Sequence, residues 1–62
     1  MTGAEPEREV YFEFVAVGGA VKVTAIDSVT SVEVSAMGPA NAARADLQRL
    51  ALQKLKARLA RE

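Results

Sequence analysis

Three carboxylates in the part of the chain expected to form a sheet are the residues whose type could carry out acid–base chemistry. Glu13, Asp27 and Glu33 lie among Val, Phe and Ile residues, and the chain has no histidine and no cysteine. We expect Glu13 and Glu33 on two strands separated by a third, two steps of about 4.8 Å apart and too far to share a proton. Asp27 precedes Ser28, where an aspartate commonly caps a turn. We therefore expect no catalytic residue and no enzymatic activity.

The Gly18-Gly19 pair is the remaining motif with possible chemistry, as a loop that cradles phosphate. It has neither the spaced glycines of a dinucleotide-binding loop nor the lysine of a P-loop. It is instead typical of a two-residue hairpin turn, in which glycine adopts a positive φ. Without His or Cys the commonest metal ligands are missing. We expect no cofactor, no metal and no small-molecule ligand.

Basic residues dominate the second half of the chain and could bind nucleic acid. Six of the eight Lys and Arg residues follow Gly38, although the formal net charge of the chain is zero. At about 100° per residue of a helix, Arg49 and Lys56 point to one side and the other bases fall elsewhere. Tyr11 is the only aromatic residue outside the expected core. We expect a solvated helix face, with RNA or DNA binding through Arg49 and Lys56 as the alternative.

The elements that position these residues follow from the hydrophobic pattern. Residues of strand type fill Val10–Val17, Ala20–Asp27 and Val32–Met37, with turn residues between them. A two-residue Gly18-Gly19 loop places Phe14 opposite Val23 and Phe12 opposite Ala25. A second turn at residues 28–31 then places Ala25 opposite Val34 and Val23 opposite Ala36. All of these apolar side chains fall on one face, and a shift of one residue would destroy that agreement.

A single long helix is expected after Gly38-Pro39. Asn41 is the predicted N-cap, and Ala42–Arg61 contains mostly good helix formers. The apolar positions of this helix form two ridges. The first consists of Ala43, Leu47, Leu50 and Ala51, and the second of Leu52, Leu55 and Leu59. A small sheet covers one side of a helix, so the second ridge needs another partner.

The predicted architecture is α+β, a three-stranded antiparallel β-meander followed by one C-terminal helix. Residues 9–62 form the domain and residues 1–8 a mobile tail. The tail is acidic and polar, unlike a signal peptide, and no apolar run approaches the ~20 residues that span a bilayer, so we expect a cytoplasmic protein without a membrane segment. The predicted core comprises Val10, Phe12, Phe14, Val21, Val23, Ala25, Val32, Val34, Leu47, Leu50, Ala51 and Leu55.

More apolar side chains remain than this core accommodates. The face of the sheet opposite the core carries several of them, and the second helix ridge adds three leucines. The first strand is an expected edge strand whose single charge is Glu13. A chain this short has little core of its own, so we expect a homodimer, with exchange of the helix at Gly38-Pro39 as one form of it and another protein as the alternative partner. The expected self-association residues are Tyr11, Val15, Val17, Ile26, Leu52, Leu55 and Leu59.

With the strands and helix placed, the chain resembles a family of short bacterial proteins of unknown function. The resemblance covers nearly the whole chain from Glu9 and implies no mechanism. It is carried by the segments 9–14 (Glu-Val-Tyr-Phe-Glu-Phe), 21–27 (Val-Lys-Val-Thr-Ala-Ile-Asp) and 38–42 (Gly-Pro-Ala-Asn-Ala). In topology the chain is also similar to the second half of double-stranded-RNA-binding domains. It departs from them in lacking their first helix and in having Ala42-Ala43 in place of a lysine pair.

Overall fold

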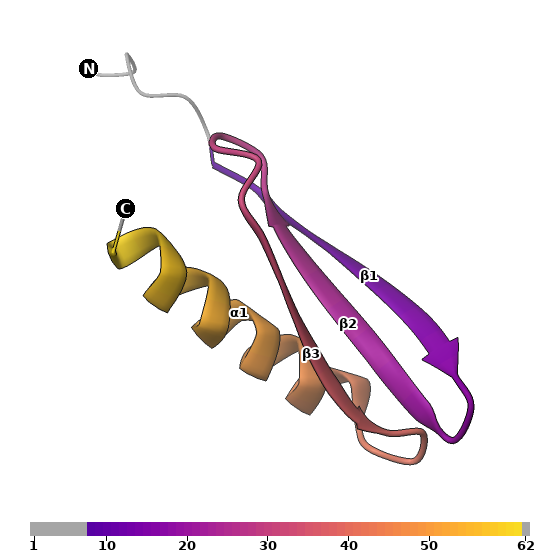
Figure 1. Cartoon of the computed structure of the whole chain (residues 1–62). Helices are drawn as coiled ribbons and strands as arrows, with labels where there is room; N and C mark the ends of the chain where they lie inside the picture. The colour runs from indigo at the N-terminus through magenta and orange to yellow at the C-terminus, as the bar shows by residue number, and fades with distance from the viewer. Residues whose placement is uncertain (1–7, 62) are drawn as a thin grey trace.

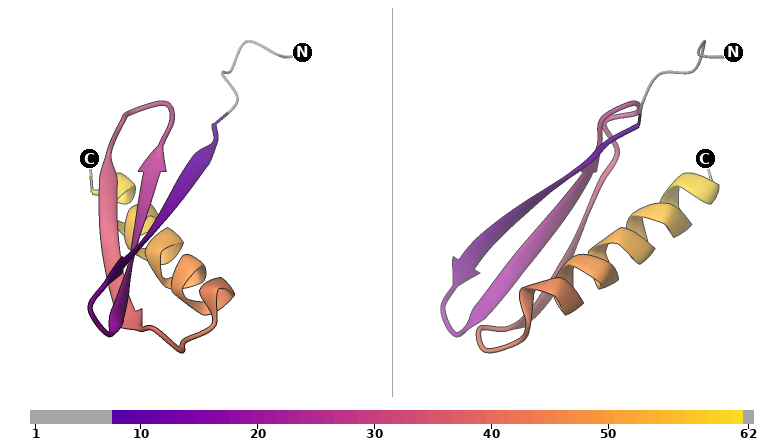
Figure 2. Two further views of the ribbon diagram at one scale, coloured as in Figure 1. Left: turned by 90° about the vertical axis from the view of Figure 1, so that its right-hand side faces the viewer. Right: turned by 180° about the vertical axis from the view of Figure 1, so that it is seen from behind.

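Three antiparallel strands and one helix make up the structure, a computed structural model that describes residues 8–61. β1 spans Val10–Val17, β2 spans Ala20–Asp27, β3 spans Glu33–Pro39 and α1 spans Arg44–Ala60. The strand order is β1-β2-β3, and α1 lies across one face of the sheet (Figure 1 and Figure 2). The predicted α+β fold is confirmed.

The first hairpin has the predicted register. Gly18 and Gly19 form the two-residue turn, with Phe14 opposite Val23 and Phe12 opposite Ala25. Gly18 adopts a φ of 60°, and Gly19 has no positive φ. A positive φ at the first turn position alone is the pattern of a type II′ turn, whose twist suits a hairpin.

The second connection also has the predicted register, with Ala25 opposite Val34 and Val23 opposite Ala36. The third strand begins at Glu33 and ends at Pro39, whereas the sequence predicts Val32–Met37. Pro39 remains in the strand because β3 is an edge strand, where a residue without an N–H is tolerated.

The start of α1 differs from the prediction. Asn41 is not the N-cap: the helix begins at Arg44, after an extended Ala43 that makes no side-chain capping hydrogen bond. The N–H of Ala42 donates to the Pro39 carbonyl, and the Ala42 side chain packs against the core. The chain needs these residues to cross from the sheet edge onto its face, so tertiary packing overrides the local capping preference.

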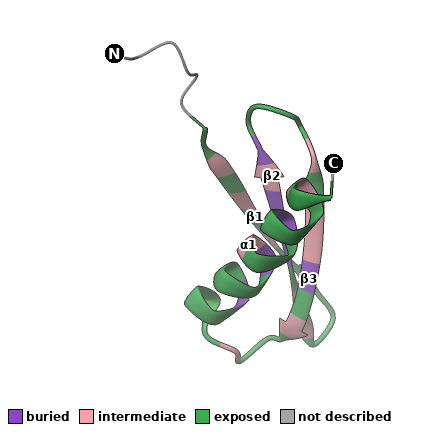
Figure 3. Ribbon diagram, turned by 90° about the vertical axis from the view of Figure 1, so that its left-hand side faces the viewer, coloured by how far each residue is buried: buried purple, intermediate pink, exposed green. Residues whose placement is uncertain are grey.

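The core lies between the sheet and one side of the helix. Val23, Ala25 and Ala36 of the sheet meet residues at a spacing of four along α1, namely Leu47, Ala51 and Leu55. Figure 3 shows the buried residues on β2, on β3 and on the inner side of α1. Most of the other predicted core residues pack partly buried around this centre: Val10, Phe12, Phe14, Val21, Val32 and Val34.

Leu50 is the error in the predicted core. Its side chain is 45% exposed, because it lies about 100° around the helix from Ala51, which faces the sheet. Ala36, absent from the predicted core, is buried in it. The expected tail, residues 1–8, falls outside the described residues except for Arg8, whose guanidinium contacts Asp27.

Gly38 allows the helix to approach the end of β3. A Cβ atom at this position would overlap the buried Leu47 side chain, whereas a Cβ at Gly19 would meet no atom within 4 Å. We expect Gly38→Ala to lower the free energy of unfolding by about 1–3 kcal/mol through overpacking. Gly19→Ala is the matched control and should change it by less than about 1 kcal/mol. Urea denaturation of both variants measures the difference; equal stabilities would contradict the close contact.

Candidate interaction surface

β1 presents half of its backbone groups to the outer edge of the sheet. The N–H of Ser28 on the β2 side donates to the Glu9 carbonyl at 2.9 Å, so Glu9 directs its carbonyl toward β2. Hydrogen-bonding direction alternates along an antiparallel strand, so the odd-numbered residues of β1 bond to β2. The even-numbered residues direct their N–H and C=O groups outward: Val10, Phe12, Phe14 and Ala16. No strand pairs with this edge within residues 8–61.

The opposite edge of the sheet, along β3, is protected. The N–H of Asp27 donates to the Val32 carbonyl, so alternation directs the groups of Ser35 outward. Lys54 of α1 donates from its ammonium to the Ser35 carbonyl at 2.6 Å. Pro39, also at an outward position, has no N–H to offer. The helix itself packs mainly on β3 and β2. Only the β1 edge lacks such protection in the described part of the chain.

The open face of the sheet, away from the helix, carries most of the predicted self-association residues. Tyr11, Val15 and Val17 of β1 are each about half exposed, at 54%, 45% and 50%. Ile26 lies opposite Tyr11 on β2 and is partly buried. Met37 on β3 is 55% exposed and extends the apolar surface across the sheet. The structure therefore brings the four predicted strand residues together on one face.

The Tyr11 side chain forms a hydrogen bond to Glu9, two residues earlier in the chain. Its hydroxyl donates to the Glu9 carboxylate at 2.8 Å. This hydrogen bond and the negative charge of Glu9 raise the pKa of Tyr11. The phenol therefore stays protonated at neutral pH, with its one O–H donated to Glu9.

The three leucines of the second helix ridge differ in how far they are buried. Leu55 is fully buried, so its predicted place in the core is confirmed and its predicted role in self-association is wrong. Leu52 and Leu59 are partly exposed. Lys54 marks the β3 side of α1 through its bond to Ser35, and Leu52 lies about 200° away around the helix. Leu52 and Leu59 therefore lie on the flank toward β1. The sequence could not assign these faces because both ridges are equally apolar.

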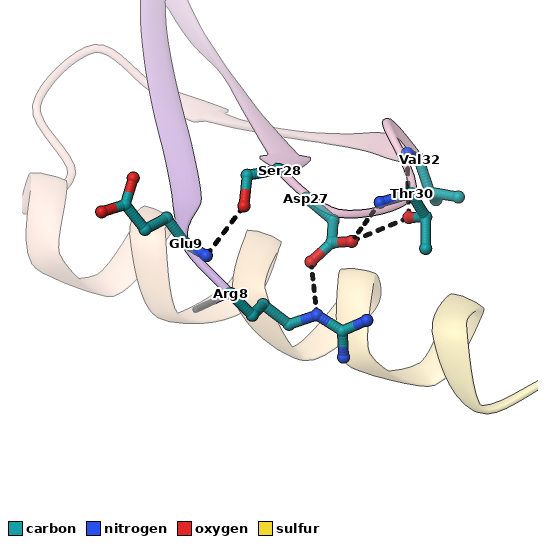
Figure 4. A network of polar contacts seen from close by, with 6 residues as sticks. All are labelled: Arg8, Glu9, Asp27, Ser28, Thr30 and Val32. Carbon is teal, nitrogen blue, oxygen red and sulfur yellow. Dashed lines mark hydrogen bonds and ion pairs between the residues drawn. The ribbon is translucent and has the colours of Figure 1, made fainter. Parts of the chain in front are cut away.

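A buried carboxylate fixes the start of β1. Asp27 is fully buried, and its Oδ2 accepts hydrogen bonds from the N–H and the hydroxyl of Thr30, both at 2.8 Å (Figure 4). The Nε atom of Arg8 lies 2.9 Å from Oδ1 but is not aligned to donate a hydrogen bond, so this contact is an ion pair. The predicted capping of this turn by Asp27 is confirmed. The adjacent N–H of Glu9 donates to the Ser28 hydroxyl at 2.9 Å.

Asp27 links the stability of the fold to acid pH. Burial acts to raise its pKa, but the hydrogen bonds from Thr30 and the charge of Arg8 outweigh burial, and the pKa lies below its ordinary 3.8. The unfolded chain then binds this proton more tightly than the folded chain. The stabilisation is complete above the ordinary pKa and is lost as the pH falls through the lowered folded value.

Replacement of Asp27 tests this linkage. We expect Asp27→Asn to lower the melting temperature near neutral pH by about 5 °C or more. Because the variant has lost the group that titrates, its melting temperature should fall less than that of the unaltered protein between about pH 6 and pH 2. Glu33→Gln removes an exposed carboxylate from the same sheet and controls for net charge. If the melting temperatures of Asp27→Asn and of the unaltered protein fall by the same amount across this pH range, the linkage is contradicted.

The remaining carboxylates do not converge. Glu13 lies opposite Thr24 and Glu33 opposite Ile26, on either side of the central strand. Residues 8–61 contain no group of three or more acidic residues placed to hold a metal ion and enclose no pocket. In the same residues, no helix has the length and apolar character needed to cross a bilayer.

Comparison with known families covers nearly the whole chain. The family described as a domain of unknown function, DUF6898, matches residues 7–62. The chain belongs to this family. The predicted resemblance to a family of unknown function is thereby confirmed. Searches of curated proteins and of solved structures found no match.

In this DUF6898 chain the basic residues are spread over different surfaces. Arg49 and Lys56, the predicted nucleic-acid residues, are exposed on the side of α1 away from the sheet, and Arg49 lies 3.4 Å from Asp46. Arg44 instead lies over the Phe14 ring, with its guanidinium carbon 4.9 Å from the ring centroid. Lys54 is engaged with Ser35. Some of these basic side chains thus contact the sheet, and together they do not gather on one face.

Proposed function

We propose that this chain is a non-enzymatic interaction module that acts as a homodimer. The observation that carries the proposal is β1, an edge strand with outward-facing backbone groups and half-exposed Tyr11, Val15 and Val17. Edge strands of monomeric proteins are normally protected by lysine, proline or covering elements, as β3 is here. Burial of this surface in a second copy would stabilise a chain whose core is small.

The residue chemistry supports a role without catalysis. The chain has no histidine and no cysteine, and the Asp27 carboxylate is occupied by Thr30 and Arg8. Glu13 and Glu33 are separated by the central strand. An acid–base pair needs two titratable groups that converge on one reacting atom, and these carboxylates do not.

Sedimentation equilibrium tests the proposal. We expect the 6.6 kDa chain to sediment at twice its mass at high micromolar concentration and to dissociate on dilution. A folded species that remains at 6.6 kDa throughout this range would overturn the homodimer.

Nucleic-acid binding is the competing outcome. The charge-reversed pair Arg49→Glu and Lys56→Glu should sediment like the unaltered chain, and neither form should be retained on mixed RNA or DNA at physiological salt. Retention that weakens steeply with salt and disappears in the double variant would replace the proposal with an RNA- or DNA-binding role.

A further inference from the structure

We infer that two copies pair through β1 in antiparallel orientation, with Phe12 opposite Phe12 of the second copy, and form one continuous six-stranded sheet. This inference rests on the proposed homodimer and names its geometry. It follows from the backbone groups on the β1 edge, the position of its single charge and the protection of the other edge. The occupant of the edge is therefore a second copy of this chain.

The first step concerns the backbone. Val10, Phe12, Phe14 and Ala16 direct their N–H and C=O groups away from β2. Two identical strands joined by a two-fold axis perpendicular to the sheet run antiparallel. The outward-facing residues of one copy must then lie opposite outward-facing residues of the other. Three of the registers that meet this condition centre on the middle of β1: Phe12 with Phe12, Phe14 with Phe14, or the register between them, in which Glu13 faces Glu13.

Charge decides among these registers. With Glu13 opposite its own copy, two like-charged side chains would stand with their Cβ atoms about 5 Å apart, which is destabilising. Centring on Phe14 places Glu13 opposite the apolar Val15. Centring on Phe12 places Glu13 opposite Tyr11, whose hydroxyl is the polar end of its ring and donates its one O–H to Glu9 within the same chain. The register centred on Phe12 is thus the one that gives Glu13 a polar neighbour.

On the face of the sheet that carries the helices, the interface between the two β1 strands is apolar in this register. Phe12 meets its counterpart, and Val10 lies opposite Phe14 on each side of the axis. All three side chains are only partly buried within one chain. Both helices fall on this same face because the axis is perpendicular to the sheet. Leu52 and Leu59, on the β1 flank of α1, then point toward the interface between the two β1 strands.

The assembly closes at two copies. Each β1 is then paired on both of its edges, and the six-stranded sheet ends in a β3 edge on both sides. Each of these edges has its Ser35 carbonyl covered by Lys54 and carries Pro39 without an N–H. A third copy therefore finds no unprotected edge among the described residues, and the contact remains isologous.

Directed disulfide formation tests the register, since the chain has no cysteine of its own. In the register centred on Phe12, Glu9 lies opposite Val15 of the second copy, with Cα atoms about 4.5 Å apart, within the range of a disulfide. Glu9→Cys and Val15→Cys chains are mixed at high micromolar concentration and oxidised mildly. Both variants keep Glu13, the residue that selects the register. We expect the mixed disulfide dimer as the main product, at least tenfold above either self-linked product.

A mixture of Glu9→Cys and Val17→Cys is the matched control, because these positions meet only when Glu13 faces Glu13, and both variants keep Tyr11 and Glu13. Cross-linking in the control mixture at the level expected for the test mixture would overturn the inferred register. A dimer in sedimentation with no cross-link in either mixture would overturn the register centred on Phe12 and leave the homodimer standing. A monomer in sedimentation would overturn both.

Discussion

Leu55→Ala is expected to have one of the two largest effects of any substitution in this chain. Leu55 is fully buried at the centre of the core, and its truncation removes packing that small neighbours such as Ala25 and Ala51 cannot replace. Such substitutions cost about 2–5 kcal/mol, whereas a domain of this length has a total stability of about 3–9 kcal/mol. We therefore expect Leu55→Ala to be largely unfolded at 37 °C.

Leu50→Ala is the matched control for this prediction. It makes the same chemical change on the same helix at a side chain that is 45% exposed. We expect its free energy of unfolding to stay within about 0.5 kcal/mol of the unaltered value. Thermal and urea unfolding followed by circular dichroism measure both variants. Comparable losses at the two positions would show that α1 is rotated relative to the arrangement described above.

Val10→Pro is expected to have the second large effect, on association of the dimer. The Val10 N–H points outward, so proline removes no hydrogen bond to β2, and proline is tolerated at the first residue of an edge strand. In the dimer the same change removes the bond to Phe14 of the second copy and places a ring against it. Each dimer contains two such pairs of Val10 with Phe14, so we expect the dissociation constant to rise at least a hundredfold.

Val10→Ala separates the backbone from the side chain in this test. It shortens the side chain but retains the N–H, so dimerisation should weaken far less than in Val10→Pro. Sedimentation across a dilution series measures both variants, and circular dichroism checks that each is folded. Equal dissociation constants for folded Val10→Pro and unaltered protein would contradict a role of this edge in assembly.

The sheet was predictable from the sequence because two local signals agree. The period-two pattern of Phe12, Phe14, Val23 and Ala25 sets the buried face, and the Gly18-Gly19 turn sets the register. A one-residue shift would have exposed the whole apolar set. The turn at Asp27 was predictable for the same reason, since aspartate caps such turns with its own side chain.

The helix was predictable as an element but not in its start or its rotation. Leucines at 47, 50, 52, 55 and 59 surround much of the helix, so periodicity alone does not choose the buried side. The choice depends on tertiary contacts, including the close approach of Leu47 to Gly38. The bond from Lys54 to Ser35, which separates the protected edge from the open one, joins residues 19 apart in the chain. No local pattern reveals such a contact.

Amide hydrogen exchange along β1 is the most direct test of the central claim that this edge pairs with a second copy. The N–H groups of Val10, Phe12 and Phe14 point outward, whereas those of Tyr11, Glu13 and Val15 bond to β2. We expect the outward set to exchange rapidly in dilute protein and to become at least tenfold slower at high micromolar concentration, with the inward set protected at both. Outward amides that exchange equally fast at both concentrations, in protein that sediments as a dimer, would contradict the account.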